Sequence, residues 1–255
     1  MTGILEGKKG LIVGIANEHS IAWGCAKAFR DAGAELAITY LNDKAYPFVA
    51  PLAAQVESPI VMPLDVRDDA QMEALFSTIS TQWGKLDFLL HSIAFAPKID
   101  LQGRVTDCSR EGFLSAMDIS CYSFIKMARM AEPLMKDGGC LITTSYYGGE
   151  RVVEHYNMMG PVKAALEGTI KYLAYELGDQ RIRVNALSPG PILTRAASGI
   201  ANFDDLIEGA RRKNPHHEMP TIEDVGAMAA FLASDGARHM TGNVTYIDCG
   251  YHIMG

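Results

Sequence analysis

A tyrosine and a lysine stand seven positions apart in the stretch EHYNMMGPVKAALEG, residues 154–168. On an ideal α-helix seven residues are about two turns, so Tyr156 and Lys163 would share one helix face roughly 10 Å apart. A phenol and an ammonium group in this arrangement could act on the two ends of one ligand. The pair alone is weak evidence, because tyrosines and lysines at this spacing are common on helices.

A proline interrupts the spacing of this pair. Proline is compatible with the first turn of a helix and disfavours helical conformation in the residue before it. Regular helix is therefore expected to begin only near Gly160 or Pro161. Tyr156 would then lie on the approach to the helix and Lys163 on the helix itself, so the two-turn geometry is approximate.

The elements that must position these side chains follow a regular order. Short apolar runs, mostly continuous as in strands covered on both faces, alternate with segments of helical periodicity. The strand candidates are residues 10–14, 35–40, 59–64, 86–92, 140–145, 182–188 and 243–248. The helical segments lie near 21–32, 45–56, 69–83, 111–136, 157–178 and 222–234. This order predicts an α/β fold spanning residues 1–255: a single-domain, Rossmann-type, doubly wound parallel sheet of about seven strands with helices on both faces.

Ligands bind such sheets outside the carboxyl ends of the strands. The strand ends expected to contact a ligand are therefore near Gly14, Tyr40, Asp65, Ser92, Ser145 and Ser188.

Composition excludes several classes of protein. The net charge of −7, from 23 basic and 30 acidic residues, argues against nucleic acid as the principal ligand. No stretch approaches the roughly 20 apolar residues of a membrane span, and the N-terminus does not resemble a secretory signal. The cysteine count is odd, at five, with no C-x-x-C pair, so a disulfide framework or zinc site is not expected and a cytoplasmic location is. His216 and His217 have no further ligands nearby in the sequence, so no metal site is predicted.

The first strand is followed by features of a phosphate site, although GIANEHSIAWG, residues 14–24, is not a G-x-G-x-x-G fingerprint. Gly14 permits a tight strand exit. Ser20 is a good helix N-cap and Ile21 begins the helix, whose free N–H groups and dipole would favour a pyrophosphate. Ala22 and Gly24 would let the helix start approach closely. A plain strand–helix turn with a capped helix is the alternative reading.

Two further strand ends favour a dinucleotide. Asp65, followed by Val66, could accept a hydrogen bond from an adenine amino group, although a lone aspartate there is more often a helix cap. Ser92 and Ile93 begin a small-residue stretch, SIAFA, that leaves room for backbone to touch a ribose.

The residue after the second strand usually distinguishes NAD from NADP. Here Leu41 is neither acidic nor basic, and no arginine follows it. Lys44 could neutralise a phosphate or could be a solvated residue at a helix start. NADH is therefore the predicted cofactor, with NADPH the weaker alternative.

The order of these parts resembles the short-chain dehydrogenase/reductases. The Tyr-x6-Lys spacing after the fifth strand, with Tyr146 upstream, is similar to that of bacterial enoyl-acyl-carrier-protein reductases, a divergent branch. Further pieces of the resemblance, which covers nearly the whole chain, are SIAWG (20–24), HSIAFAP (91–97), SREGF (109–113), DIS (118–120), RVNALSPGPILTRAASGI (183–200) and TIEDVG (221–226).

The resemblance implies hydride transfer from NADH to the β-carbon of a trans-2-enoyl thioester in bacterial fatty-acid elongation. Tyr156 would donate to the thioester oxygen, where negative charge develops. Lys163 would hold the nicotinamide ribose hydroxyls, and its cation would favour the developing anion nearby. Tyr146 and Ala96 would line the acyl pocket with Tyr156. A direct part for Tyr146 in proton transfer is the less certain of these roles.

The resemblance also implies cofactor contacts from Ile192, Thr194 and Ala196, and a substrate flap near 194–213. The implied partners are acyl carrier protein bearing the thioester and further copies of the chain in a homotetramer.

Two other functions remain open from the sequence: a carbonyl-directed NAD(P)-dependent reductase of the same fold, and a non-catalytic NAD(H)-sensing regulator. The literal Tyr-x-x-x-Lys match, Tyr122 to Lys126, precedes the fifth strand and is expected to serve packing or a subunit interface. Pro189 and Cys249 depart from the branch pattern, which has Ser-Ala-Gly-Pro and Asp-Gly-Gly at these places.

Overall fold

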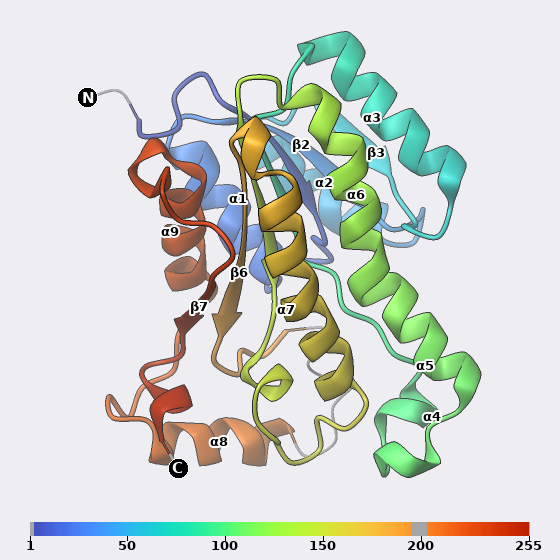
Figure 1. Cartoon of the computed structure of the whole chain (residues 1–255), viewed down its shortest axis with the longest axis vertical. Helices are drawn as coiled ribbons and strands as arrows, with labels where there is room; N and C mark the ends of the chain where they lie inside the picture. Colours follow the sequence, from blue (N-terminus) through green and yellow to red (C-terminus); the bar gives the residue numbers. More distant parts are fainter. Residues whose placement is uncertain (1–2, 195–202, 255) are drawn as a thin grey trace.

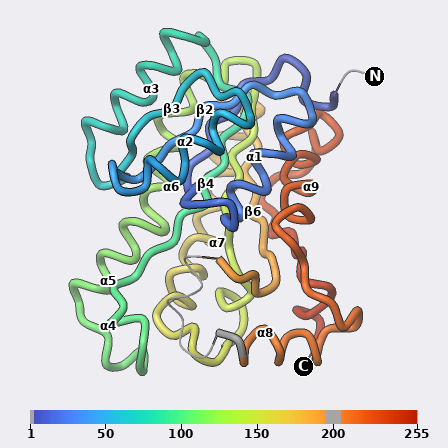
Figure 2. The backbone as a smooth tube through the Cα atoms, turned by 180° about the vertical axis from the view of Figure 1, so that it is seen from behind, coloured from blue at the N-terminus to red at the C-terminus, as the bar shows by residue number. Residues whose placement is uncertain are grey.

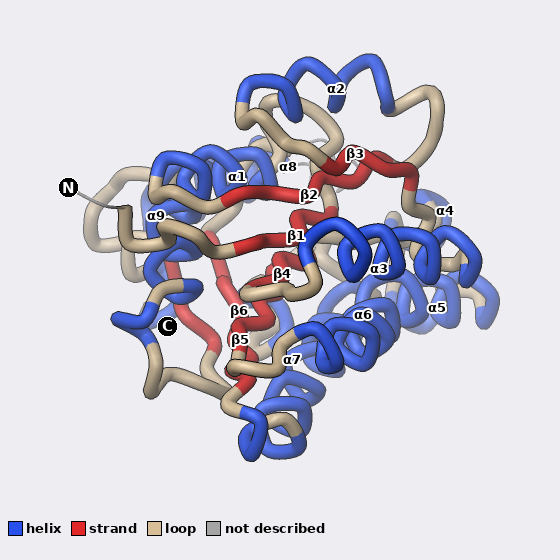
Figure 3. The backbone as a smooth tube through the Cα atoms, turned by 90° about the horizontal axis from the view of Figure 1, so that it is seen from above, coloured by secondary structure: helices blue, strands red, loops and turns tan. Residues whose placement is uncertain are grey.

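A computed structural model describes residues 3–194 and 203–254. It contains one seven-stranded sheet in the order β3-β2-β1-β4-β5-β6-β7, seen edge-on in Figure 3. All six strand pairings are parallel. The strands are β1 (Lys9–Val13), β2 (Glu35–Tyr40), β3 (Ile60–Pro63), β4 (Phe88–His91), β5 (Gly139–Thr144), β6 (Ile182–Pro189) and β7 (Val244–Ile247). The predicted doubly wound fold is confirmed.

Helices cover both faces of the sheet (Figures 1 and 3). One apolar core lies between the sheet and α1 (Ile21–Asp31), α2 (Tyr46–Gln55) and α9 (Ile222–Ala233). The other lies beneath α3 (Asp69–Trp83), α6 (Ser123–Ala131) and α7 (Met159–Glu176). The remaining α-helices of the described chain are α4 (Lys98–Leu101), α5 (Arg110–Met117) and α8 (Phe203–Lys213). Figure 2 shows α8 lying at the same end of the molecule as the start of α7.

The single helix expected over 111–136 is interrupted by a π-helical turn at Asp118–Tyr122, between α5 and α6. Ser123 Oγ donates to the Ile119 carbonyl oxygen at 2.7 Å. Ser120 Oγ accepts from the Phe95 amide at 2.9 Å and donates to the Phe95 carbonyl oxygen at 3.1 Å. The irregular turn thus joins the helix to the segment that follows β4, and π turns are frequent at functional sites.

Gly24, expected to let the helix start approach closely, makes a close contact with a second helix. A Cβ at Gly24 would lie 2.2 Å from the Ile222 carbonyl oxygen, and one at Gly226 would lie 2.4 Å from the Gly24 carbonyl oxygen. These two glycines therefore let α1 and α9 pack with their backbones in contact. The sequence near the first strand did not reveal this contact, because Ile222 and Gly226 stand far along the chain.

Candidate active site

The crevice at the carboxyl ends of the strands is centred on Gly14, where β1 ends. Its φ of +118° is in a region that residues with side chains rarely adopt, and a Cβ there would lie 2.1 Å from the Ser92 carbonyl oxygen. Only glycine fits this position. β1 pairs with β2 on one side and β4 on the other, so Gly14 and Ser92 lie at the point where the strand order reverses.

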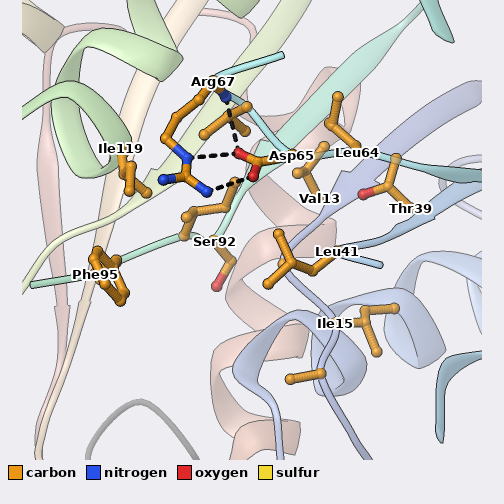
Figure 4. Close-up of a pocket in the computed structure, with 15 residues that line it drawn as sticks. Val13, Ile15, Thr39, Leu41, Leu64, Asp65, Arg67, Ser92, Phe95 and Ile119 are labelled. Atoms are coloured by element: carbon orange, nitrogen blue, oxygen red, sulfur yellow. Dashed lines mark hydrogen bonds and ion pairs between the residues drawn. The ribbon is translucent and has the colours of Figure 1, made fainter. Parts of the chain in front are cut away.

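Two cavities meet at this point and share five lining residues: Gly14, Ala16, Ser92, Ile93 and Ala94. The larger, about 340 Å³, lies towards β2 and β3 (Figure 4) and is lined by Val13, Gly14, Ile15, Ala16, Thr39, Leu41, Leu64, Asp65, Val66, Arg67, Ser92, Ile93, Ala94, Phe95 and Ile119. The smaller, about 120 Å³, is lined by Gly14, Ala16, Ser20, Ile21, Ser92, Ile93, Ala94, Thr144, Lys163 and Thr194. Together they form a crevice along five strand ends, with Asp65 and Arg67 towards one end and Lys163 at the other, which suits an extended dinucleotide.

Most residues predicted for the cofactor line these two cavities. Leu41, Asp65 and Val66 line the larger, Ser20, Ile21, Lys163 and Thr194 the smaller, and Gly14, Ser92 and Ile93 line both. Ile192 is partly buried against the core of the α1, α2 and α9 face. Ala196 and residues 195–202 of the predicted flap lie outside the described residues, and the described end of that flap is α8.

Ser20 occupies the N-cap position of α1, but its hydroxyl makes a different bond from the one expected. Ser20 Oγ accepts from the backbone amides of Ala16 and Asn17, at 3.0 and 3.1 Å, and makes no side-chain cap bond to the helix. It thereby fixes the loop between β1 and α1. The Trp23 amide donates to the Ser20 carbonyl oxygen at 2.9 Å, so the amides of Ile21 and Ala22 are the ones left to a ligand or to water.

Asp65 is held by a residue that the sequence did not single out. Arg67 Nε lies 3.0 Å from Asp65 Oδ1, Arg67 Nη2 lies 2.6 Å from Oδ2, and the Arg67 backbone amide donates to Oδ1 at 3.0 Å. The hydrogen bonds from Arg67 hold the pKa of Asp65 below its usual value, so Asp65 is ionised at neutral pH. The D-x-R spacing after a strand was the available signal.

Tyr156 lies in the turn before α7, as the proline suggested, since the helix begins at Met159. Its neighbours His155 and Asn157 both have positive φ, 64° and 47°. Left-handed backbone at two residues with side chains stores strain, and such strain clusters at functional sites. Asn157 Nδ2 also donates to the Leu101 carbonyl oxygen at 2.7 Å. The turn is thus fixed on both sides of Tyr156, which is 7% exposed.

Lys163 is an ammonium group almost removed from solvent, at 4% exposure. Its Nζ donates to the Thr144 carbonyl oxygen at 2.6 Å, at the end of β5. Desolvation lowers the pKa of Lys163 to about 8, and the nearby Glu167 carboxyl opposes that shift. An ammonium that lines the smaller cavity and keeps N–H donors unused by Thr144 can hold hydroxyl groups or an anion.

Tyr146 and Tyr156 meet edge to face, with ring centroids 4.8 Å apart. Burial raises the pKa of both phenols, so both are neutral hydrogen-bond donors at neutral pH. The Tyr146 hydroxyl is buried and has no hydrogen-bond partner in the described chain. An apolar cluster that includes Ala96, Leu101 and Met159 surrounds the two rings. The predicted substrate residues Ala96, Tyr146 and Tyr156 are therefore brought together.

Glu167 is a further acidic residue beside this group. It lies one turn beyond Lys163 on α7 and accepts a hydrogen bond from Ser145 Oγ. Burial raises its pKa above the ordinary glutamate value. The sequence contained the signal, because Glu167 is four residues after Lys163 and therefore on the same helix face.

Tyr122 and Lys126 lie away from the crevice. Tyr122 is 54% exposed at the end of the π turn. Lys126 forms an ion pair with Asp69 at the start of α3. Neither lines the two cavities described above.

Residues 3–194 and 203–254 offer neither a metal site nor a membrane-spanning helix. No three or more His, Cys, Asp or Glu side chains are grouped as a metal would require. No helix in this part of the chain has the length and apolar character needed to cross a membrane.

Comparison with known proteins gives one consistent family. A family model described as enoyl-(acyl carrier protein) reductase matches residues 14–252. An NADH enoyl-[acyl-carrier-protein] reductase of Aquifex aeolicus is 50% identical over 254 residues, which cover 99% of this chain and 94% of that protein. The crystal structure of the Anaplasma phagocytophilum enoyl-(acyl-carrier-protein) reductase in complex with NAD is 47% identical, with a TM-score of 0.96, and the match covers 100% of this chain and 97% of that one.

A further solved relative, the Bacillus cereus enoyl-acyl carrier protein reductase with NADP⁺ and indole naphthyridinone, is 44% identical, with a TM-score of 0.97 and 99% of each chain covered. Matches of this identity over whole chains extend to the crevice and the Tyr156 turn as well as to the sheet. The chain belongs to the enoyl-[acyl-carrier-protein] reductase family of the short-chain dehydrogenase/reductases.

Proposed function

We propose that this protein reduces the trans-2 double bond of enoyl thioesters carried by acyl carrier protein, with NADH as reductant, in bacterial fatty-acid elongation. The relatives are named for this activity. The proposal depends most on the placement of three side chains. Buried Lys163 lines the smaller cavity of the crevice. The neutral phenols of Tyr146 and Tyr156 meet in the apolar cluster beside the turn that precedes α7.

The described residues suit each part of this reaction. NADH supplies the hydride that the β-carbon receives. As it arrives, negative charge builds on the thioester oxygen as an enolate, and Tyr156 is the proposed donor to that oxygen. A neutral phenol whose pKa is raised by burial keeps its proton and so stabilises the oxygen by donation. Tyr146 and Ala96 are proposed to line the acyl pocket.

Lys163 is the proposed holder of the nicotinamide ribose. It lines the smaller cavity with Thr194, whereas Asp65 and Leu41 line the larger one at the other end. We assign the pyrophosphate to the start of α1, near Ser20 and Ile21, where backbone amides and the helix dipole favour an anion. Contacts from Ile192, Thr194 and Ala196 to the nicotinamide stay predictions.

The end of β2 favours NADH over NADPH. Leu41, 55% exposed, lines the larger cavity and offers no charge to a 2′-phosphate. Lys44 follows in an exposed turn, where Asn42 Oδ1 accepts from the Lys44 backbone amide at 3.1 Å. Because the Bacillus cereus relative was solved with NADP⁺, the preference is best measured as the ratio of NADH to NADPH affinities.

The outer faces of α6 and α7 support association with further copies of the chain. Tyr122, Tyr172 and Tyr175 are 54, 73 and 86% exposed, and Ile125 is 36% exposed. The two helices run side by side on one face of the molecule (Figure 1). Exposed aromatic groups of this kind mark protein interfaces. A homotetramer is the assembly we propose, and Tyr172→Glu with Tyr175→Glu should lower the mass measured by analytical ultracentrifugation.

The segment 194–213 is proposed as the substrate flap. In its described part, Arg211, Arg212 and Lys213 are exposed at the end of α8, suitable for an acidic carrier surface. Hydrogen exchange in α8 should slow when cofactor and substrate bind together, and an unchanged rate would contradict the flap. A cytoplasmic location remains a prediction from the cysteine pattern.

The proposed reaction is tested by following NADH oxidation spectrophotometrically. Crotonyl thioesters should be reduced and 3-ketoacyl thioesters should not. The opposite preference would favour a carbonyl reductase, and tight NADH binding without turnover of either would favour a cofactor-sensing regulator.

A further inference from the structure

Arg67 is held in a fixed orientation at the adenine end of the crevice. Two of its N–H groups meet the two oxygens of Asp65, at 3.0 and 2.6 Å. A bidentate pair of this kind fixes the plane of the guanidinium group, which a single hydrogen bond does not. The side chain stays 58% exposed, so the flat group is available to a ligand.

Arg67 differs from every other residue around the larger cavity. Among the fifteen described residues that line it, Arg67 is the one cation, in a wall made mostly of apolar side chains. In Figure 4 the arginine reaches from Asp65 towards Ile119, above Ser92. A ligand ring that entered between the strand ends would therefore meet a planar cation on one side and aliphatic side chains on the others.

We propose that the Arg67 guanidinium stacks on the adenine ring of NADH and completes the adenine pocket, with Asp65 orienting it. A planar, delocalised and weakly hydrated cation is attracted to the face of an aromatic ring. This inference rests on the proposed function in one respect, that the dinucleotide bound here is NADH.

The hydrogen bonds on Asp65 leave room for its predicted contact with adenine as well. A carboxylate offers about four acceptor positions. The Arg67 backbone amide and Nε use two on Oδ1, and Nη2 uses one on Oδ2. One position on Oδ2 remains for the adenine amino group, so Asp65 can orient Arg67 and bind adenine at the same time.

The charges favour an uncharged ring over a phosphate at this place. Asp65 neutralises Arg67, so the pair has no net charge to offer a 2′-phosphate dianion. Asp118 adds a further negative charge near Arg67. The pair also follows β3, one strand beyond Leu41, which follows β2.

Equilibrium binding to the apo protein tests this inference, with calorimetry or fluorescence as the readout. Arg67→Ala should weaken NADH binding about three- to fivefold, the size of a partly exposed cation–π contact. Arg67→Lys should lose nearly as much NADH affinity, because lysine keeps the charge but lacks the planar guanidinium group. Reduced nicotinamide mononucleotide, which has no adenosine, should bind equally to the wild-type protein, Arg67→Ala and Arg67→Lys. Lys126→Ala, which breaks an ion pair on the outer helices, is the matched control and should leave NADH affinity unchanged.

Three results would overturn the stacking role: full affinity in Arg67→Lys, an effect on NADPH alone, or an equal loss for the mononucleotide. The first would show that charge suffices, the second a phosphate contact and the third a general disturbance of the crevice. Failure of the wild-type protein to bind NADH would contradict the proposed function itself, and is thereby distinguished from a failure of Arg67.

Discussion

The Nζ of Lys163 lies 2.6 Å from the carbonyl oxygen of Thr144, the last residue of β5. This contact fixes a buried ammonium group against the strand whose next residues are Ser145 and Tyr146. The lysine of α7 and the tyrosines near it are therefore positioned against the same strand end. We expect the arrangement to bind the cofactor at the expense of stability, because a charged group is buried with one hydrogen bond, to the Thr144 carbonyl oxygen.

Lys163→Met should stabilise the apo protein at pH 7 while weakening NADH binding. The folded pKa of about 8 lies below the ordinary value of 10.5, so burying the charged form costs free energy below pH 8. Removing the charge should raise the free energy of unfolding by on the order of 2 kcal/mol, once the loss of the hydrogen bond to Thr144 is subtracted. Thermal unfolding and NADH titration of the same sample measure both effects. A lower Tm, or unchanged NADH affinity, would contradict this role.

The affinity for NADH should fall as pH rises above about 8, where apo Lys163 loses its proton. Between about 8 and 10.5 the unfolded chain binds more protons at this lysine than the folded chain, so its contribution to stability rises with pH in that window. Lys163→Met should abolish this part of the pH dependence of NADH binding.

Glu167→Gln should move the alkaline loss of NADH affinity to lower pH. The Glu167 carboxylate favours the charged form of Lys163, and removing it lowers the pKa of that lysine further. Glutamine keeps an oxygen to accept from Ser145 Oγ. Glu150 and Lys171 are the other charged groups near Glu167. Glu150→Gln removes a neighbouring acidic charge but keeps Glu167, and it therefore serves as the matched control. An unchanged pH profile in Glu167→Gln would show that Glu167 acts only in packing.

Cys249→Gly should stabilise the protein by about 0.5–1 kcal/mol. Cys249 has a φ of +55°, in the left-handed region that favours glycine. The Asp-Gly-Gly pattern expected from the sequence would place a glycine at this left-handed position. Cys249→Ala keeps the strained backbone and should give no such gain in chemical denaturation. Equal stabilities for the two variants would contradict this assignment of strain.

The sequence predicted the sheet well because buried strands and amphipathic helices produce strong local patterns. All seven strands and the helices α1, α2, α3, α6, α7 and α9 lie where the periodicity indicated. The π turn at Asp118–Tyr122 was missed because its apolar pattern continues that of the flanking helices. α8 was expected only as a flap, because charged residues outnumber apolar ones in it.

Errors in the site arose from contacts that local patterns do not contain. Ser20 has the right type and position for a cap, yet the loop before it takes its hydroxyl. Gly24 contacts α9, which no nearby residue reveals. The Asp65–Arg67 pair depends on a side-chain direction that spacing alone does not fix.

Tyr156 is proposed to stabilise charge that develops on the substrate during hydride transfer. The most direct measurement is kcat for a crotonyl thioester, with the NADH dissociation constant, in Tyr156→Phe, Tyr146→Phe and Tyr122→Phe. Tyr156→Phe should lower kcat by up to about 10²–10³-fold, less if water or a cofactor hydroxyl also donates to the enolate, with NADH binding nearly unchanged. Tyr146→Phe should lower kcat less than Tyr156→Phe does, and Tyr122→Phe should leave kcat nearly unchanged. A larger loss of kcat in Tyr146→Phe than in Tyr156→Phe would exchange the roles of the two tyrosines. Abolished activity in Tyr122→Phe alone would contradict the role proposed for Tyr156.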